Sequence, residues 1–179
     1  MQQAEAVWKT RQLVLETARL AIFPLSKGEM NLYMQPGNAL ENYFGLHPGN
    51  REITPELTDA LHHSIIPAVQ NGDPLLEFVT LWTMICRQDN IMVGDLCFKG
   101  RPGPKKEIEI GYGTYPDFRG KGYMTEAIVA ITDWALTRPD VQLILAETKE
   151  ENIASQQILK KAAFQPYKQE RGMIFWKKD

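Results

Sequence analysis

Apolar and polar positions divide the chain into an early helical region and a later region richer in strands. Residues 13–25 alternate well enough to predict a first strand, interrupted near Thr17–Arg19 and closed by Pro24. Helices are then expected at 26–34, 39–44 and 54–70, with Ser26 and Thr54 as N-caps and Pro67 kinking or shortening the last one.

From Leu75 onward the period changes to that of a strand. Strands are predicted at 75–87 and 91–100 around an Asp89-Asn90 turn, at 107–115, at 143–148, and in a closing hairpin over 165–179 turning near Arg171-Gly172. Helices are predicted at about 124–137 and 153–163. This order predicts an α/β fold, with a mixed sheet covered by helices on both faces.

The predicted strand 107–115 has two unlike sides. Ile108, Ile110 and Tyr112 share one side, while the other carries Glu107, Glu109, Gly111 and Gly113. Two glycines on one side of a strand fit the close approach of a ligand, and they fit a bulge or bend equally well.

A glycine-rich turn, DFRGKGYMTE at 117–126, joins this strand to the long helix. Glycines let the backbone pass close to an anion, and a helix that begins here directs free N–H groups towards it. Arg119 and Lys121 add positive charge, so the turn is predicted to hold phosphate. Its spacing matches neither a P-loop nor the Gly-x-Gly-x-x-Gly fingerprint of dinucleotide-binding folds.

Composition fits one ordinary domain, 1–179, with residues 1–12 expected to be a flexible or loosely packed segment. The net charge of −2 favours neither nucleic acid nor anionic membrane as a partner. No signal peptide or membrane span is evident, so a cytoplasmic location is expected. Cys86 and Cys97 are interpreted as reduced core thiols, and the adjacent His62 and His63 diverge on a helix, so no metal site is predicted.

Three ordered blocks resemble the GNAT superfamily of N-acetyltransferases, in particular its ribosomal-protein N-terminal acetyltransferase branch. EIGYGTYPDFRGKGYMTEA resembles the block that contains the acyl-CoA pyrophosphate loop, AETKEENIASQQILKKAAF resembles the Asn-x-x-Ser block, and LETARLAIFPLS resembles the opening strand. Met124 departs from the usual Gly or Ala, and residues 26–90 match only in outline.

The resemblance implies a GNAT fold, which has a central, mixed, splayed and mostly antiparallel sheet. It also implies acetyl-CoA as the acyl donor. The cofactor-binding residues carried over are Gly113, Thr114 and Tyr115 through their backbone groups, the loop Arg119, Gly120, Lys121, Gly122, Tyr123 and Met124, and Asn152 beside the cofactor arm. Asn152 is also well placed to cap the helix that follows it, and both roles can hold at once, because a side chain at the start of a helix is also next to the cleft.

Acetyl transfer needs an uncharged amine and an acid for the leaving thiolate. Glu109 is the first candidate for the base and Glu107 the second, although a strand with one solvated face shows the same alternation. The tyrosine that many GNAT enzymes use as the acid is replaced by Leu159. The resemblance assigns this role to Ser155 instead.

The expected function is acetyl transfer to a primary amine by direct attack, and the resemblance points to a protein N-terminus as acceptor. A small-molecule acetyltransferase acting on a polyamine, amino sugar or antibiotic is the alternative, and a non-catalytic CoA-binding regulatory module is a third hypothesis. Acceptor specificity is expected within 26–71, with carboxylates drawn from Glu29, Glu41, Glu52 and Glu56. The sequence leaves open whether the protein is a monomer or a homodimer.

Overall fold

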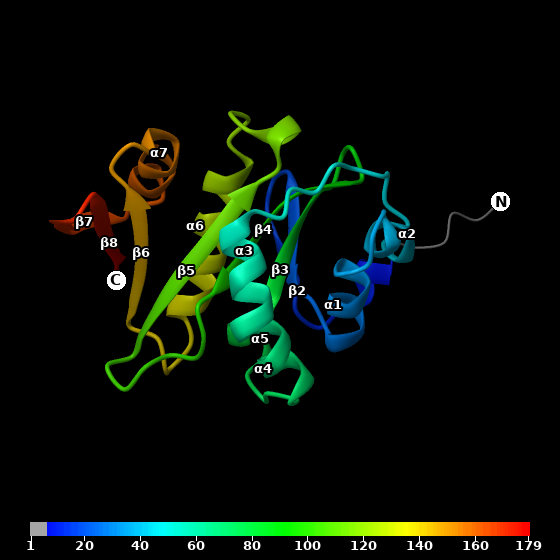
Figure 1. The fold of residues 1–179 in the computed structure, drawn as a ribbon, viewed down its shortest axis with the longest axis horizontal. Coiled ribbons are helices and arrows are strands. Elements are labelled where there is room, and N and C mark those ends of the chain that lie inside the picture. Colours follow the sequence, from blue (N-terminus) through cyan, green and yellow to red (C-terminus); the bar gives the residue numbers. More distant parts are fainter. Residues whose placement is uncertain (1–6) are drawn as a thin grey trace.

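The computed structural model describes residues 7–179. Its strands form one sheet of eight strands (Figure 1). The strand order is β1-β2-β3-β4-β5-β6-β8-β7. Neighbouring strands are antiparallel except β5 and β6, which are parallel. The strands are β1 (Leu15–Glu16), β2 (Leu20–Pro24), β3 (Leu81–Cys86), β4 (Ile91–Phe98), β5 (Glu107–Thr114), β6 (Leu143–Lys149), β7 (Gln165–Glu170) and β8 (Met173–Lys178). The predicted mixed, mostly antiparallel sheet is therefore confirmed.

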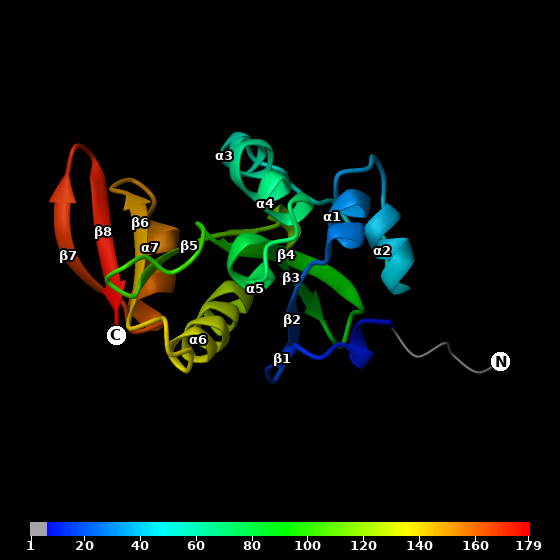
Figure 2. The same ribbon diagram turned by 90° about the horizontal axis from the view of Figure 1, so that it is seen from below.

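Helices cover both faces of this sheet (Figure 2). One face carries α1 (Lys27–Tyr33), α2 (Ala39–Phe44), α3 (Pro55–Ala60) and α4 (Ile66–Gln70); the other carries α5 (Leu76–Val79), α6 (Tyr123–Leu136) and α7 (Ile153–Lys161). Because successive side chains of a strand point to opposite faces, each face has its own apolar core. Phe23 and Ile85 pack beneath α1–α4, whereas Ile22 and Met84 pack towards α6.

The first strand is interrupted where the sequence predicts, because β1 ends at Glu16 and β2 begins at Leu20. The segment before it is packed in part, since Trp8 is buried whereas Lys9, Thr10 and Gln12 are exposed. Trp8 is buried within a short 3₁₀ turn, Val7–Thr10, and its ring stacks on Phe23 with the ring centroids 6.4 Å apart. Residues 1–6 of the predicted loose segment 1–12 lie outside the described residues.

The prediction of a continuous strand over 75–87 is wrong at its beginning. Leu76–Val79 form the helical turn α5, and β3 begins only at Leu81. The Asp73 side chain accepts a hydrogen bond from the Leu75 N–H (2.9 Å), and the Trp82 indole N–H donates to the Glu77 carbonyl (2.7 Å). These bonds and the burial of Phe78 against Phe98 stabilise a turn that a local apolar run cannot reveal.

The predicted helix 54–70 is a continuous helical stretch, with a π-helical segment, Leu61–Ile65, between α3 and α4. The Ile66 N–H reaches back to the Leu61 carbonyl, just before Pro67, which has no N–H to donate. Thr54 caps the stretch as predicted, accepting from the Leu57 N–H at 3.2 Å. The stretch runs through Pro67 to Gln70, so the expected shortening does not occur, and the irregularity is the π-helical segment just before Pro67.

A buried polar cluster joins α1 and α2 to the sheet. Asp95 on β4 accepts hydrogen bonds through Oδ2 from the hydroxyls of Tyr33 (2.8 Å) and Tyr115 (2.5 Å). The fully buried Glu41 pairs with Arg51, whose Nε lies 2.8 Å from Oε1. Buried polar groups of this kind are costly unless each is paired, so the cluster fixes how the α1–α2 layer sits on β4.

We expect Asp95 to make the stability of the protein pH-dependent. Burial raises its pKa from 3.8 to about 6, although both tyrosine hydroxyls and Arg51 favour the charged form. The folded protein therefore holds this proton more tightly than the unfolded chain does, and the resulting stabilisation is lost as the pH rises towards 6. Between about pH 4 and pH 7.5, wild type should lose about 2 kcal/mol of unfolding free energy relative to Asp95→Asn.

Urea unfolding of both proteins at the two pH values measures this difference, in which the titrations common to both cancel. A difference that does not change with pH would show that Asp95 stays ionised throughout.

Candidate active site

The parallel strands β5 and β6 separate part of the way along the sheet. They pair only where Glu107–Glu109 face Leu143–Leu145. Beyond this, β5 stays paired with β4 as far as Thr114, and β6 stays paired with β8 as far as Lys149. The facing edges of the two strands therefore diverge towards the end of the sheet where α6 and α7 begin (Figure 1). Such a gap between splayed strands can accept an extended ligand along a free strand edge.

The predicted phosphate loop lies at the mouth of this gap, and its residue Gly122 is the N-cap of α6. Gly120 (φ +74°) and Gly122 (φ +79°) are both in the left-handed region that favours glycine. No side chain of the described residues caps the helix, and its first internal bond runs from the Glu126 N–H to the Gly122 carbonyl at 3.2 Å. The N–H groups of the first turn, Tyr123 to Thr125, therefore have no partner within the helix and are available to an anion.

A cavity of about 230 Å³ opens between this loop and α7. It is lined by the loop, the end of β5 and one face of α7: Thr114, Phe118, Gly120, Gly122, Tyr123, Met124, Thr125, Ala154, Gln157, Ile158 and Lys161. A second hollow of about 490 Å³ lies along α6 and shares Gly122, Thr125 and Lys161 with the first. The loop residues are thus exposed to a space of ligand size.

The two predicted loop cations have different surroundings. Arg119 is engaged by the protein itself, because its Nε donates to the Thr114 carbonyl (3.1 Å) and its Nη2 contacts the Glu52 carboxylate. The Lys121 ammonium lies over the Phe118 ring, 5.1 Å from the centroid. A phosphate in the loop would therefore compete with Glu52 for Arg119.

The predicted cofactor residues Gly113, Thr114 and Tyr115 lie at the end of β5. The Tyr115 N–H is already used, donating to the Val93 carbonyl at 3.0 Å, so it is directed towards β4. A Cβ at Gly113 would meet nothing within 4 Å, and β5 runs in continuous register opposite β4. The glycines therefore mark no bulge in β5, and open space lies beside Gly113.

Asn152 is the N-cap of α7, and its side-chain oxygen accepts the Ser155 N–H at 3.0 Å. The capping interpretation of this residue is confirmed. Its side chain is exposed at the start of the helix that borders the cavity.

Ser155 forms a hydrogen bond with Tyr112, a residue predicted from the sequence only to lie on the apolar side of β5. The Ser155 hydroxyl donates to the Tyr112 oxygen at 3.1 Å, and this contact bridges α7 and β5 across the gap. Burial raises the pKa of Tyr112 to about 12, although the bond from Ser155 opposes the shift. The tyrosine missing at position 159 thus has a counterpart on β5, which the E-I-G-Y block contained but side-chain alternation did not identify.

Glu109 lies on the opposite side of β5 from Tyr112 and forms an ion pair. Its carboxylate contacts the Lys99 ammonium, which also lies 2.9 Å from Glu147 on β6. Although burial opposes it, hydrogen bonding to Glu109 and Glu147 raises the pKa of Lys99. The structure therefore does not bring Glu109 and Ser155 together, and it shows an ammonium already held by the predicted base.

Lys161 is a further cation that sequence reasoning missed. It lines both hollows beside the phosphate loop. The signal was present, because helical spacing from Ala154 through Ile158 places Lys161 on the same face of α7.

The donors present fit the diphosphate of a CoA ester. The first turn of α6 is uncapped, both loop glycines are in the left-handed region, Lys161 lines the cavity, and the Lys121 ammonium lies over the ring of Phe118, another lining residue. Within residues 7–179, no group of three or more His, Cys, Asp or Glu side chains is arranged to hold a metal ion. No helix in the same range is both long and apolar enough to cross a membrane.

Comparison with known proteins places these features in context. Residues 24–165 match the family model described as an acetyltransferase (GNAT) domain. The uncharacterized N-acetyltransferase YjdG of Bacillus subtilis is 36% identical over 83 residues, which cover 46% of this chain and 49% of that protein. The chain thus spans about half the length of the curated relatives that it matches.

Two solved structures share the fold over almost the whole chain. One is RimL, a ribosomal L7/L12 α-N-protein acetyltransferase in complex with coenzyme A, with a TM-score of 0.61, 17% identity, and coverage of 93% of this chain and 97% of that one. The other is an acetyltransferase from Salmonella typhimurium that modifies the N-terminal serine of ribosomal protein L7/L12, with a TM-score of 0.62, 18% identity, and coverage of 93% and 98%.

Proposed function

The chain belongs to the GNAT acetyltransferase family, and from this premise we propose that it transfers the acetyl group of acetyl-CoA to a primary amine by direct attack. One observation carries the proposal. The gap between β5 and β6 opens beside the uncapped first turn of α6, so a strand edge for an extended arm and a set of free N–H groups for a diphosphate lie together.

The loop from Arg119 to Met124 would hold the diphosphate, with Tyr123 and Met124 contributing first-turn amides and Lys161 adding a second cation from α7. Gly113 and Thr114 would pair with the extended arm along the free edge of β5. Tyr115 was expected to do the same, but its N–H donates to Val93 and its carbonyl accepts from the Phe118 N–H, so we leave it out of this pairing. Asn152 would contact the arm from the start of α7. When bound, acetyl-CoA supplies the reactive thioester carbonyl.

The proposed proton transfers use groups on both sides of β5. An aliphatic amine is mostly protonated at neutral pH, so a carboxylate must accept a proton before the attack. We propose Glu109 for this role, and its ion pair with the ammonium of Lys99 supports the proposal that this carboxylate can bind a cationic amine. The incoming amine would take over this kind of contact, either directly or through water.

On the other side of β5, Ser155 and Tyr112 form a hydroxyl pair that can donate a proton to the leaving sulfur and replace it from solvent. The two side chains come from the two elements that flank the gap. We therefore add Tyr112 to the residues proposed for the acid step.

The acceptor remains a proposal, and we favour a protein N-terminus because RimL acts on one. Three of the four carboxylates expected to hold it are already paired with arginines. Glu29 is buried against Arg11, with Nη1 and Oε1 2.5 Å apart, and Glu41 is buried against Arg51. Glu56 at the start of α3 is exposed, and Glu52 contacts Arg119.

We also propose that residues 1–179 act as one domain, supported by the sheet that continues from β1 to β8. A cytoplasmic location is proposed because Cys86 and Cys97 are buried free thiols, as expected in a reducing compartment. The proposed partner is an amine-bearing substrate, with neither nucleic acid nor membrane required.

Release of CoA from acetyl-CoA, measured against a panel of amines, tests the function and its acceptor together. Short N-terminal peptides should give the highest kcat/KM, since the proposed acceptor is a protein N-terminus. Polyamines and amino sugars form the comparison set, and a Gly122→Val protein serves as the control with weakened acetyl-CoA binding. A preference of about a hundredfold for the small amines, roughly 2.7 kcal/mol of transition-state discrimination, would contradict the peptide acceptor.

A further inference from the structure

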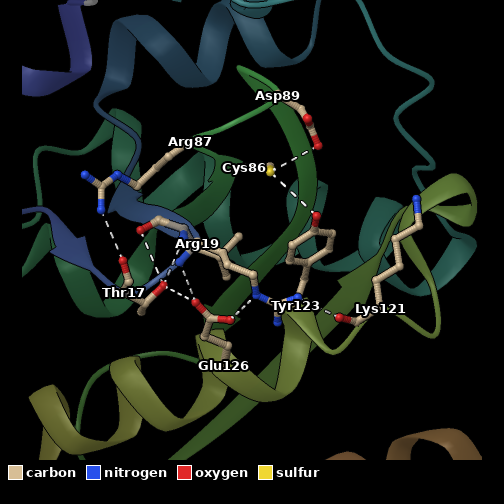
Figure 3. Close-up of polar contacts among 9 residues, drawn as sticks. Thr17, Arg19, Cys86, Arg87, Asp89, Lys121, Tyr123 and Glu126 are labelled. Atoms are coloured by element: carbon tan, nitrogen blue, oxygen red, sulfur yellow. Dashed lines mark hydrogen bonds and ion pairs between the residues drawn. The ribbon is translucent and has the colours of Figure 1, made fainter.

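The Thr17–Leu20 segment has no part in the chemistry proposed above, yet it lies against the first turn of α6 (Figure 3). Glu126 in that turn accepts three hydrogen bonds from it. Thr17 Oγ1 donates to Oε1 at 2.5 Å, the Arg19 backbone N–H donates to Oε1 at 2.9 Å, and Arg19 Nε donates to Oε2 at 2.7 Å. The break between β1 and β2 is therefore fastened to the helix that begins at the phosphate loop.

The Arg19 guanidinium also contacts the two residues on either side of Gly122. Its Nη1 donates to the Lys121 carbonyl at 2.9 Å, and its Cζ lies 4.6 Å from the centroid of the Tyr123 ring. A Cβ at Gly122 would come within 3.4 Å of its Nη2. One planar, multivalent side chain thus sets the positions of the residues that precede and open α6.

Tyr123 ties the same turn to β3. Its hydroxyl lies 3.6 Å from Cys86 Sγ, which in turn contacts Asp89 Oδ2 at 3.4 Å (Figure 3). The loop is therefore held from the break between β1 and β2 and from the end of β3. An anion entering at the first-turn amides meets a preformed backbone.

The charges in this cluster indicate an indirect role for Arg19. A carboxylate in the first turn of a helix repels an anion bound there, so Glu126 needs compensation. Burial opposes ionisation of Glu126, but hydrogen bonds from Thr17 and Arg19 outweigh it and lower the pKa, so the carboxylate stays charged. Arg19 neutralises that charge and is thereby already paired.

Building on the proposed function, we infer that Arg19, with Thr17 and Glu126, is a positioning residue for acetyl-CoA. It holds residues 121–123 so that the first-turn amides of α6 face the diphosphate. Arg19 thereby sets affinity for the nucleotide end of the donor without taking part in acetyl transfer.

The test compares acetyl-CoA with S-acetylpantetheine, which lacks the diphosphate and nucleotide, in wild type and Arg19→Gln. The KM for acetyl-CoA and the calorimetric Kd for CoA should both rise about thirtyfold, with kcat within about twofold. The kcat/KM for S-acetylpantetheine should stay within about twofold. Adding Glu126→Gln to Arg19→Gln should recover at least about threefold of the CoA affinity, since it removes the uncompensated carboxylate.

Arg87→Gln is the matched control. Arg87 has the same charge and similar exposure and donates to the Thr17 carbonyl at 3.1 Å, but it pairs with Glu16 instead of the loop. The Arg87→Gln protein should bind CoA with the same Kd as the wild-type protein. If Arg19→Gln does not fold, Arg19→Lys keeps the charge without the planar fork and should still weaken CoA binding about fivefold.

Equal losses with both donors, or an unchanged Kd for CoA in the Arg19 variants, would overturn the inference while leaving the proposed function intact. Wild-type protein that binds no CoA would overturn the proposed function, and the inference with it.

Discussion

Replacing Gly122 with valine is expected to weaken acetyl-CoA binding by about a hundredfold, or roughly 2.7 kcal/mol. Gly122 is the N-cap of α6 at φ +79°, a conformation that a β-branched residue avoids. The Cβ of the valine would also lie 3.4 Å from Arg19 Nη2, in a tight contact. The loop must then change conformation, and this turns the first-turn amides away from the diphosphate. Isothermal titration with acetyl-CoA, at a temperature where both proteins are folded, measures the change.

Gly72→Val provides the matched control for this experiment. Gly72 has φ +72°, and a Cβ there would meet nothing within 4 Å, so the backbone strain is similar but lies beyond the end of α4. This variant should lose stability while its Kd for acetyl-CoA stays unchanged. Equal weakening in both variants would attribute the effect to general destabilisation instead of the loop.

Removing either proposed proton-transfer group should lower kcat by about tenfold to a thousandfold, with acetyl-CoA binding nearly unchanged. Glu109→Gln removes the base while keeping the shape of the side chain. Ser155→Ala and Tyr112→Phe remove the two hydroxyls of the acid pair separately. Steady-state kinetics on the best acceptor, together with the calorimetric Kd for acetyl-CoA, separate catalysis from binding.

The pattern of losses assigns the roles. Ser64→Ala is the control for Ser155→Ala. Ser64 is exposed on the π-helical segment Leu61–Ile65 and does not line either hollow beside the phosphate loop. A large loss in Tyr112→Phe with little loss in Ser155→Ala would make the phenol the donor. Unchanged kcat in Glu109→Gln would move the base to Glu107, Glu147 or water, and unchanged kcat in all three variants would mean that orientation supplies most of the rate.

Local patterns predicted most of the fold. The alternation in β5, the capping residues Ser26 and Thr54, and the break between β1 and β2 are all present as expected, because each depends on neighbours in sequence. The helical turn at Leu76–Val79 was not predictable in this way. It depends on the packing of Phe78 against Phe98 and Trp134, residues distant in the chain.

The candidate site shows the same division. The loop 119–124 could be proposed from the sequence because glycines before a helix favour anion binding on physical grounds alone. The side-chain contacts around the site were not predicted, because they join residues far apart in the chain. Arg19 and Glu126 are 107 residues apart, and Ser155 and Tyr112 are 43 apart. The prediction that Glu29 and Glu41 help to hold the acceptor amine was also wrong. Both are buried and paired with arginines, which their spacing in the sequence does not reveal.

The most direct test of the central claim is the melting temperature of the wild-type protein with and without acetyl-CoA. At a hundred times the Kd, binding to the folded state alone adds about 2.7 kcal/mol of stability. For a chain of this size, this should raise the melting temperature by about 5 to 10 °C. No shift at acetyl-CoA concentrations well above micromolar would contradict the assignment of the loop and the β5–β6 gap to this donor.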